Sequence, residues 1–297
     1  GARDQQGHLC DKKLRKAASH KQVKMIELKL AQGAKPGKGG ILPGKKVTEE
    51  IAEIRGITPY QAAISPNRHP EIENDDDLLD MINHIRKVTG LPVGIKTVIS
   101  DPAWLDQFCQ RIHDRGIESA PDFITLDSGE GGTGAAPMTL VDDVGLSIRE
   151  SLPLAADTLM RQELKERIRL VASGKLIAPG DVAWALCAGA DFINNARGFM
   201  FSLGCIQALR CDTDTCPTGV TTHNKRLQKG LDPKKKSVKA GQYCRSMVHH
   251  VHILARSCGV ESPRDFRRHH AYIVQADGRP KRMNEIFPYP ESAARIR

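Results

Sequence analysis

Three closely spaced cysteines carry the most specific chemical signal in this sequence. Cys205, Cys211 and Cys216 form a C-x5-C-x4-C-P pattern, which ends at Pro217. Structural zinc usually takes four nitrogen or sulfur ligands, and the nearest further candidate, His223, lies outside the run. Iron–sulfur clusters are held by thiolates, often with proline after the last one. We therefore favour a three-iron (3Fe-4S) cluster over zinc, and three unligated thiols stay an alternative.

A glycine-rich run at residues 127–137 is the second candidate, because it directly follows the short apolar stretch Phe123–Leu126. Glycines let a backbone approach a flat or anionic ligand closely and leave its N–H groups free to donate hydrogen bonds. A flexible turn is the alternative. The residues that we assign to a ligand site here are Ser128, Gly129, Glu130, Gly131, Gly132, Thr133 and Gly134.

Two shorter loops are candidates for binding phosphate. They are Ser173-Gly174-Lys175 and Ala196-Arg197-Gly198, and each follows an apolar stretch. Barrels of alternating strands and helices often bind phosphate between their last two strands, on backbone N–H groups and the start of a short helix. Two ordinary turns are the alternative. The cysteines just downstream favour a redox cofactor as the ligand that carries this phosphate.

Lys96 is an unexpected residue inside the apolar stretch Val93–Val98. A buried ammonium group is costly unless it is paired. If Lys96 points into the mouth of a barrel, its charge can stabilise negative charge on a reduced flavin ring or on a substrate carboxylate. The alternative is a lysine at a strand end whose stem reaches water.

Short β-branched stretches alternate with longer helical patterns, which indicates an α/β fold with a parallel sheet buried on both faces. Gly-, Ser- and Pro-rich loops follow the strands, where βα barrels carry their functional residues. We expect helices over 48–55, 75–88, 103–115, 181–188 and 237–257. We expect six strands, over 25–30, 61–65, 93–98, 123–126, 168–172 and 192–195.

The composition excludes several classes of protein. Net charge is +9, but aromatic residues are only 4% and no stretch interleaves them with basic residues, so we expect no nucleic-acid partner. No apolar run reaches the roughly 18 residues of a membrane span. Residues 1–19 are polar and basic, unlike a signal peptide. Without an export signal, we expect the eight cysteines to be thiols rather than disulfides. We expect a cytoplasmic protein.

The motifs together resemble one family. Residues 33–40, 127–137 and 196–219 are similar to the FMN-binding synthase domain of glutamate synthase, nearest to its stand-alone branch, and the resemblance runs from about Val23 to Thr222. It implies a (β/α)8 barrel with FMN and a 3Fe-4S cluster that converts 2-oxoglutarate, via 2-iminoglutarate, to glutamate. Lys96 and Glu130 would then act in catalysis, and Cys205, Cys211 and Cys216 would hold the cluster.

By this resemblance the chain is incomplete at its N-terminal side. The family barrel begins with two strands that precede anything here, and six strands cannot close an eight-stranded barrel. We expect a barrel portion over 1–222, then a basic linker, a helix and a tail over 223–297. The basic surface would dock an acidic electron donor such as a ferredoxin. The alternatives are a catalytically incomplete iron–sulfur module and a flavin barrel with another substrate.

Overall fold

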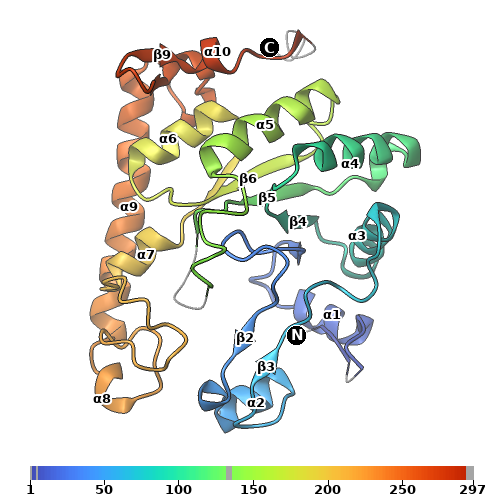
Figure 1. The fold of residues 1–297 in the computed structure, drawn as a ribbon, viewed down its shortest axis with the longest axis vertical. Coiled ribbons are helices and arrows are strands. Elements are labelled where there is room, and N and C mark those ends of the chain that lie inside the picture. Colours follow the sequence, from blue (N-terminus) through green and yellow to red (C-terminus); the bar gives the residue numbers. More distant parts are fainter. Residues whose placement is uncertain (1, 5, 132–135, 292–297) are drawn as a thin grey trace.

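A parallel sheet of five strands forms the centre of the molecule (Figure 1). The computed structural model describes residues 2–4, 6–131 and 136–291. In sheet order the strands are β1 (Ile26–Lys29), β4 (Val93–Thr97), β5 (Phe123–Asp127), β6 (Arg169–Ser173) and β7 (Phe192–Asn194). The helices that precede β4 and connect the later strands are α3 (Asp75–Thr89), α4 (Pro102–Arg115), α5 (Ile148–Arg161) and α6 (Pro179–Ala188). Because the sheet is open, the predicted architecture of an incomplete βα barrel is confirmed.

One predicted strand does not belong to this sheet. Residues 61–65 contain only β3 (Ala63–Ile64), which pairs antiparallel with β2 (Ile41–Leu42) in a separate ribbon. The ribbon also carries the short 3-10 helix η1 (Gly44–Lys46) and α2 (Glu49–Arg55). The apolar pattern was misleading because Ile64 is 73% exposed and contributes nothing to the core.

Polar side chains and a glycine define the ends of two of these helices. Asn74 accepts a hydrogen bond from the amide of Asp77 at the start of α3, and Asp101 accepts one from Ala103 at the start of α4. Gly90 ends α3 with a left-handed φ of 69°. Gly90 and Asp101 thus fix the short loops that enter and leave β4.

Side chains alternate between the two faces of the sheet. Val93 and Ile95 of β4 are fully buried against the layer of helices α3 to α6. The next residue, Lys96, lies on the opposite face, in register with Lys29 of β1 and Thr125 of β5. At the centre of the sheet this second face is also buried, since Thr125 is 1% and Val171 is 7% exposed. The expectation of a sheet buried on both faces therefore holds for the middle of β4, β5 and β6 and fails at the edge strand β7, where Phe192 is half-exposed.

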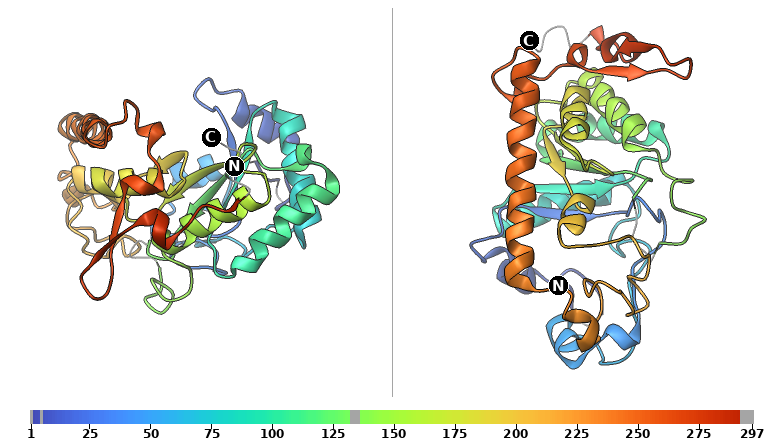
Figure 2. Two further views of the ribbon diagram at one scale, coloured as in Figure 1. Left: turned by 90° about the horizontal axis from the view of Figure 1, so that it is seen from above. Right: turned by 90° about the vertical axis from the view of Figure 1, so that its left-hand side faces the viewer.

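A long helix, α9 (Pro233–Ser257), runs along one side of the molecule and packs on α6 (Figure 2). It buries Val251 and Ala255. The remaining elements are α1 (Asp11–Ala18), η2 (Ile117–Ser119), α7 (Arg197–Ser202), α8 (Lys225–Gln228), η3 (Pro263–Asp265), η4 (Arg268–His270), β8 (Tyr272–Val274), β9 (Pro280–Arg282) and α10 (Met283–Ile286). The boundary at residue 222 stays a prediction.

Arg268 joins the C-terminal segment to the central domain. Its side chain is fully buried, lies 2.5 Å from the carboxylate of Asp157 on α5, and donates to the carbonyl of Phe287 at 2.9 Å. Burial raises the pKa of Asp157, although the hydrogen bond and charge of Arg268 oppose that shift. The pair therefore fixes the tail only while both partners are present.

We expect Arg268→Met to lower the free energy of unfolding by about 3 kcal/mol, because it leaves the largely buried Asp157 carboxylate without its partner. The neighbouring Arg267→Met is the control, since Arg267 is exposed, and its effect should stay within about 0.5 kcal/mol. Urea unfolding of both variants measures the difference. Equal stabilities of the two would contradict this role of Arg268.

Candidate functional site

A cavity of about 790 Å³ lies at the carboxyl ends of the parallel strands. Each strand contributes a polar side chain to its wall: Lys29, Lys96, Asp127, Ser173 and Asn194. The loops after the strands and the cysteine-containing segment complete it. Because these strands are parallel, their carboxyl ends meet at one edge, and distant parts of the sequence share one site.

The cavity brings together most of the residues that the sequence predicts for a site. The predicted residues that line it are Lys96, Gly131, Ser173, Gly174, Lys175, Ala196, Arg197, Cys205, Cys211 and Cys216. Ser128, Gly129, Glu130 and Gly198 are not among the lining residues. Gly132, Thr133 and Gly134 lie outside the described residues.

Two lysines from neighbouring strands create the positive charge on the cavity floor. Lys29 and Lys96 are register partners on β1 and β4. Partial burial, and then the charges of Lys96 and Lys35, lower the pKa of Lys29, while Asp127 and Glu27 oppose this. Glu27 lies 4.0 Å from the Lys96 ammonium. The floor can therefore stabilise an anionic group of a ligand.

Asp127 and Ser173 connect the floor to the surrounding loops. One oxygen of the Asp127 carboxylate accepts a hydrogen bond from the amide of Gly33 at 3.1 Å. The other accepts one from the Ser173 hydroxyl at 3.2 Å. The carboxylate therefore holds the loops after β1 and β6 at a common position beside the cavity.

The part of the glycine-rich loop behind the cavity has a structural role. The amide of Ser128 donates to the carbonyl of Ser173 at 2.8 Å. A side chain at Gly129 would place Cβ 2.1 Å from the carbonyl oxygen of Gly145. The carboxylate of Glu130 accepts a hydrogen bond from the amide of Ile148 at the start of α5. The catalytic role of Glu130 stays a prediction, and this geometry gives it a capping role.

The two predicted phosphate loops lie side by side because β6 and β7 are neighbours. Lys175 has a left-handed φ of 43°, and Gly174 has room for no side chain because Cβ would lie 2.0 Å from the Ser128 hydroxyl oxygen. Lys175 and Arg197 add two cations to the wall. The loops thus offer positive charge and closely placed backbone.

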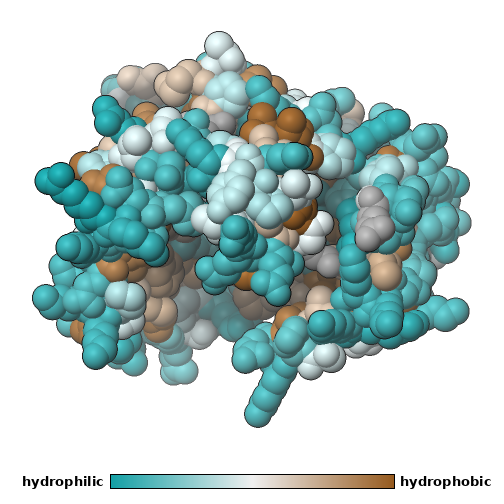
Figure 3. Space-filling model, turned by 90° about the horizontal axis from the view of Figure 1, so that it is seen from below, coloured by the Kyte–Doolittle hydropathy of each residue, from teal (hydrophilic) through white to brown (hydrophobic). Residues whose placement is uncertain are grey.

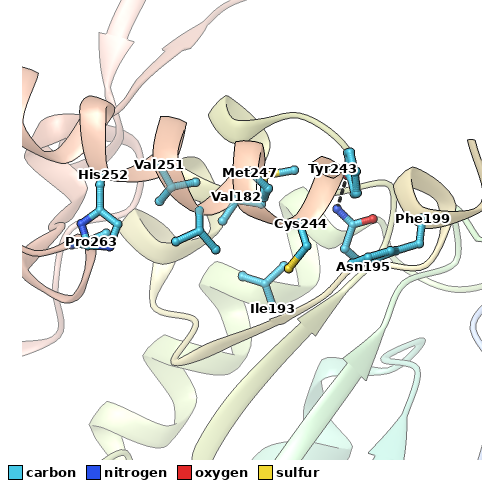
Figure 4. Close-up of a pocket in the computed structure, with 11 residues that line it drawn as sticks. Val182, Ile193, Asn195, Phe199, Tyr243, Cys244, Met247, Val251, His252 and Pro263 are labelled. Atoms are coloured by element: carbon cyan, nitrogen blue, oxygen red, sulfur yellow. Dashed lines mark hydrogen bonds between the residues drawn. The ribbon is translucent and has the colours of Figure 1, made fainter. Parts of the chain in front are cut away.

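A tyrosine from α9 fixes the second loop (Figure 4). The amide of Gly198 donates to the side-chain oxygen of Asn195 at 3.0 Å, and the Asn195 amide group donates to the Tyr243 hydroxyl at 2.6 Å. Tyr243 in turn donates to the carbonyl of Ile177 at 2.7 Å. A second, mostly apolar cavity of about 330 Å³ lies beside this chain of hydrogen bonds and shares Asn195 with the first.

The three cysteines all belong to the lining of the large cavity. Among the described residues, no group of three or more His, Cys, Asp or Glu side chains is placed to hold a metal ion. Burial opposes the thiolate of Cys216, but hydrogen bonds involving Thr218 and Thr221 outweigh it and lower the pKa to about 6. The cavity lining therefore includes three cysteines, and Cys216 is a thiolate at neutral pH.

A family model described as the conserved region in glutamate synthase matches residues 16–261. The chain belongs to this glutamate synthase family. It is 43% identical over 279 residues to the glutamate synthase large subunit-like protein YerD of Bacillus subtilis, covering 94% of this chain and 52% of that protein. It is 34% identical over 246 residues to the archaeal glutamate synthase [NADPH] of Methanocaldococcus jannaschii, covering 82% and 47%.

The glutamate synthase family member therefore spans about half the length of these relatives. Its fold is similar to that of a mutant flavocytochrome b2 with benzoylformate, at a TM-score of 0.50 and 16% identity, over 86% of this chain and 49% of that one. The likeness supports the fold assignment.

Sequence reasoning did not find several residues that build this family member's site. The sequence analysis assigned Lys29 only to a strand and Asp127 only to the start of the glycine-rich run. A charged residue at alternate positions of an apolar strand was a usable signal for a site on one face of the sheet. Asn195 and Tyr243 gave no local signal, because they meet across 48 residues of sequence.

Gly198→Ala should destabilise the protein by about 1–3 kcal/mol, because the new Cβ would lie 1.9 Å from the Tyr243 hydroxyl oxygen. The control is Gly180→Ala in α6, where nothing lies within 4 Å of the added carbon and a neutral or slightly stabilising effect is expected. Thermal unfolding monitored by circular dichroism compares the two. A Gly198→Ala protein as stable as Gly180→Ala would show that Tyr243 does not confine the loop.

Alkylation of Cys216 by iodoacetamide in the metal-free protein should rise with pH and reach half its maximal rate near pH 6, because the thiolate reacts and dominates above its pKa. Cys109 and Cys187 should remain unmodified in the folded protein, since burial raises their pKa to about 12. Mass spectrometry of the modified peptides measures all three. A Cys216 midpoint near that of an ordinary thiol would refute the assignment.

Proposed function

We propose that this chain is the flavin-binding portion of a glutamate synthase-type oxidoreductase that converts 2-oxoglutarate, via 2-iminoglutarate, to glutamate. One observation carries the proposal: Lys96, the two phosphate loops and the three cysteines line the same cavity. Such chemistry needs three things in one place: a cofactor that transfers hydride, a site for anions and a group of thiolates. Membership of the glutamate synthase family supports the same reaction.

FMN fits this cavity by size and charge. The volume of about 790 Å³ lies in the range of cofactor sites. Residues 173–175 and 196–198 would hold the phosphate, through backbone N–H groups and the cations of Lys175 and Arg197. When bound, FMN supplies hydride-transfer chemistry. Lys96 would stabilise negative charge at the ring or at a substrate carboxylate, and Lys29 adds to the same positive field.

A 3Fe-4S cluster fits the donor set of Cys205, Cys211 and Cys216. A cluster spreads its thiolate ligands over several iron atoms, so it does not require three sulfur atoms around one ion. The lowered pKa of Cys216 makes the ligating form available at neutral pH. When bound, such a cluster supplies one-electron transfer.

The basic residues suggest where an acidic electron donor would dock. Between residues 223 and 240 the only acidic residue is Asp232. The basic residues of the same segment are Lys225, Arg226, Lys229, Lys234, Lys235, Lys236 and Lys239. They lie on α8, directly after it and at the start of α9, where Lys236 approaches Gly204 next to the cysteine segment. Figure 3 shows that this side of the molecule is mostly hydrophilic. An acidic protein such as a ferredoxin would bind there in a salt-dependent manner.

One relative is the ferredoxin-dependent glutamate synthase 2 of Synechocystis, and the archaeal relative is named for NADPH. We favour the protein donor because of the charge on α8 and α9. No helix in the described ranges is long and apolar enough to cross a membrane.

An alternative function is an iron–sulfur binding module without flavin chemistry. The observation that favours it is the open sheet, whose second face carries the half-exposed Phe192. A cluster bound without FMN, even at excess FMN, would be its signature.

The proposal predicts an ultraviolet-visible spectrum with flavin bands and sulfur-to-iron absorption after anaerobic reconstitution. We expect about one FMN and three iron atoms per chain, as one flavin site and one 3Fe-4S cluster require. Cys216→Ser should lose iron, whereas Cys258→Ser, an exposed thiol distant in sequence, should retain it. A reconstituted protein with neither FMN nor iron would overturn the proposal.

Lys96→Met should slow reoxidation of the reduced flavin by 2-iminoglutarate roughly a hundredfold, because it removes a fixed charge at which negative charge develops. Lys96→Arg keeps the charge and should lose much less. Stopped-flow absorbance of the flavin measures both rates. Unchanged rates in Lys96→Met would remove this residue from the mechanism.

A further inference from the structure

Lys46 is a buried ammonium group next to the cysteine segment. Its residue is only 9% exposed, and it lies in η1 of the β2–β3 ribbon. The side-chain nitrogen donates to the carbonyl of Cys211 at 2.5 Å and to the carbonyl of Thr221 at 2.9 Å. Within the described part of the chain it makes no ion pair with a carboxylate. Burying such a charge is costly, and the two carbonyls only partly compensate it.

The two accepting carbonyls bracket a loop that contains Cys216. Residues 211 and 221 are its ends, so one side chain holds both ends at a fixed separation. Inside the loop, Asp214 accepts a hydrogen bond from the amide of His223 at 2.8 Å. The loop is therefore closed by polar contacts, and Lys46 supplies the contact from outside it.

Cys205 is anchored by a different part of the fold. Its amide donates to the carbonyl of Met200 at 3.0 Å, which fixes it to the end of α7 after β7. The positions of the other two cysteines depend on the ribbon through Lys46. The three thiols thus reach one cavity from two separately built supports.

We propose that Lys46 is the positioning residue that sets Cys211 and Cys216 relative to Cys205, and that its fixed positive charge favours an anionic sulfur centre there. Its effect on the loop is independent of any cofactor, while its effect on iron retention rests on the proposed function. The neighbouring Lys45 also donates to this loop, at the Thr213 carbonyl, but it is exposed, so water can replace its hydrogen bond.

The test is amide hydrogen exchange of the metal-free protein, followed by iron retention against a chelator after reconstitution. Lys46→Met should speed exchange within residues 211–221 roughly tenfold to a hundredfold, because two charge-assisted hydrogen bonds are lost. It should also shorten the retention of iron. Lys45→Met should leave both close to wild type, and Lys46→Arg, which keeps charge and donors, should restore much of the protection.

The outcomes separate this inference from the proposed function. Unchanged exchange and iron retention in Lys46→Met would overturn the inference and leave the cluster proposal standing. Faster loop exchange in a protein whose wild type binds no iron would support the positioning role and refute the cluster. Exchange in β4 to β6 reports global folding. If Lys46→Met fails to fold, the comparison is made between Lys46→Gln and Lys46→Arg. Equal rates of amide exchange in the loop of these two variants would overturn the role of the charge.

Discussion

The alternation of side chains along parallel strands is the constraint on which the site depends. One face of each strand must be apolar to pack on α3 to α6, so Ile95, Ile124 and Leu170 are fully buried. The other face is then free to carry Lys29 and Lys96 at the same level. A shift of one residue in register would exchange these sets and bury the ammonium groups in the core, at a cost that no nearby contact would offset. The core and the site are thus two consequences of one register.

The elements outside the sheet act as supports for loops that the sheet alone would leave free. Tyr243 of α9 reaches Asn195 and confines the turn at Gly198. Lys46 of the ribbon reaches both ends of the loop that contains Cys216. Both contacts join segments far apart in the sequence, so the site depends on the helix and ribbon as much as on the strands.

The sequence predicted the parts of this structure that have local causes. Short β-branched stretches identified the parallel strands, and the Gly-, Ser- and Pro-rich loops identified their carboxyl ends. The ribbon strand at residues 63–64 was misassigned because local pattern does not report burial, and Ile64 is exposed. The supports by Tyr243 and Lys46 were not predicted because an ordinary tyrosine or lysine gives no signal until the fold places it beside its partner. Glu130 stood in a recognisable motif, yet its carboxylate lies at the start of α5.

The proposed function requires that residues 173–175 and 196–198 form an anion site for the phosphate of a flavin. Equilibrium titration of the protein with FMN and with riboflavin, followed by flavin fluorescence, isolates the contribution of that phosphate. FMN should bind at least about tenfold more tightly than riboflavin, since only FMN carries the charged group that these loops can bind. Equal affinities for the two flavins, or no binding of either, would contradict it.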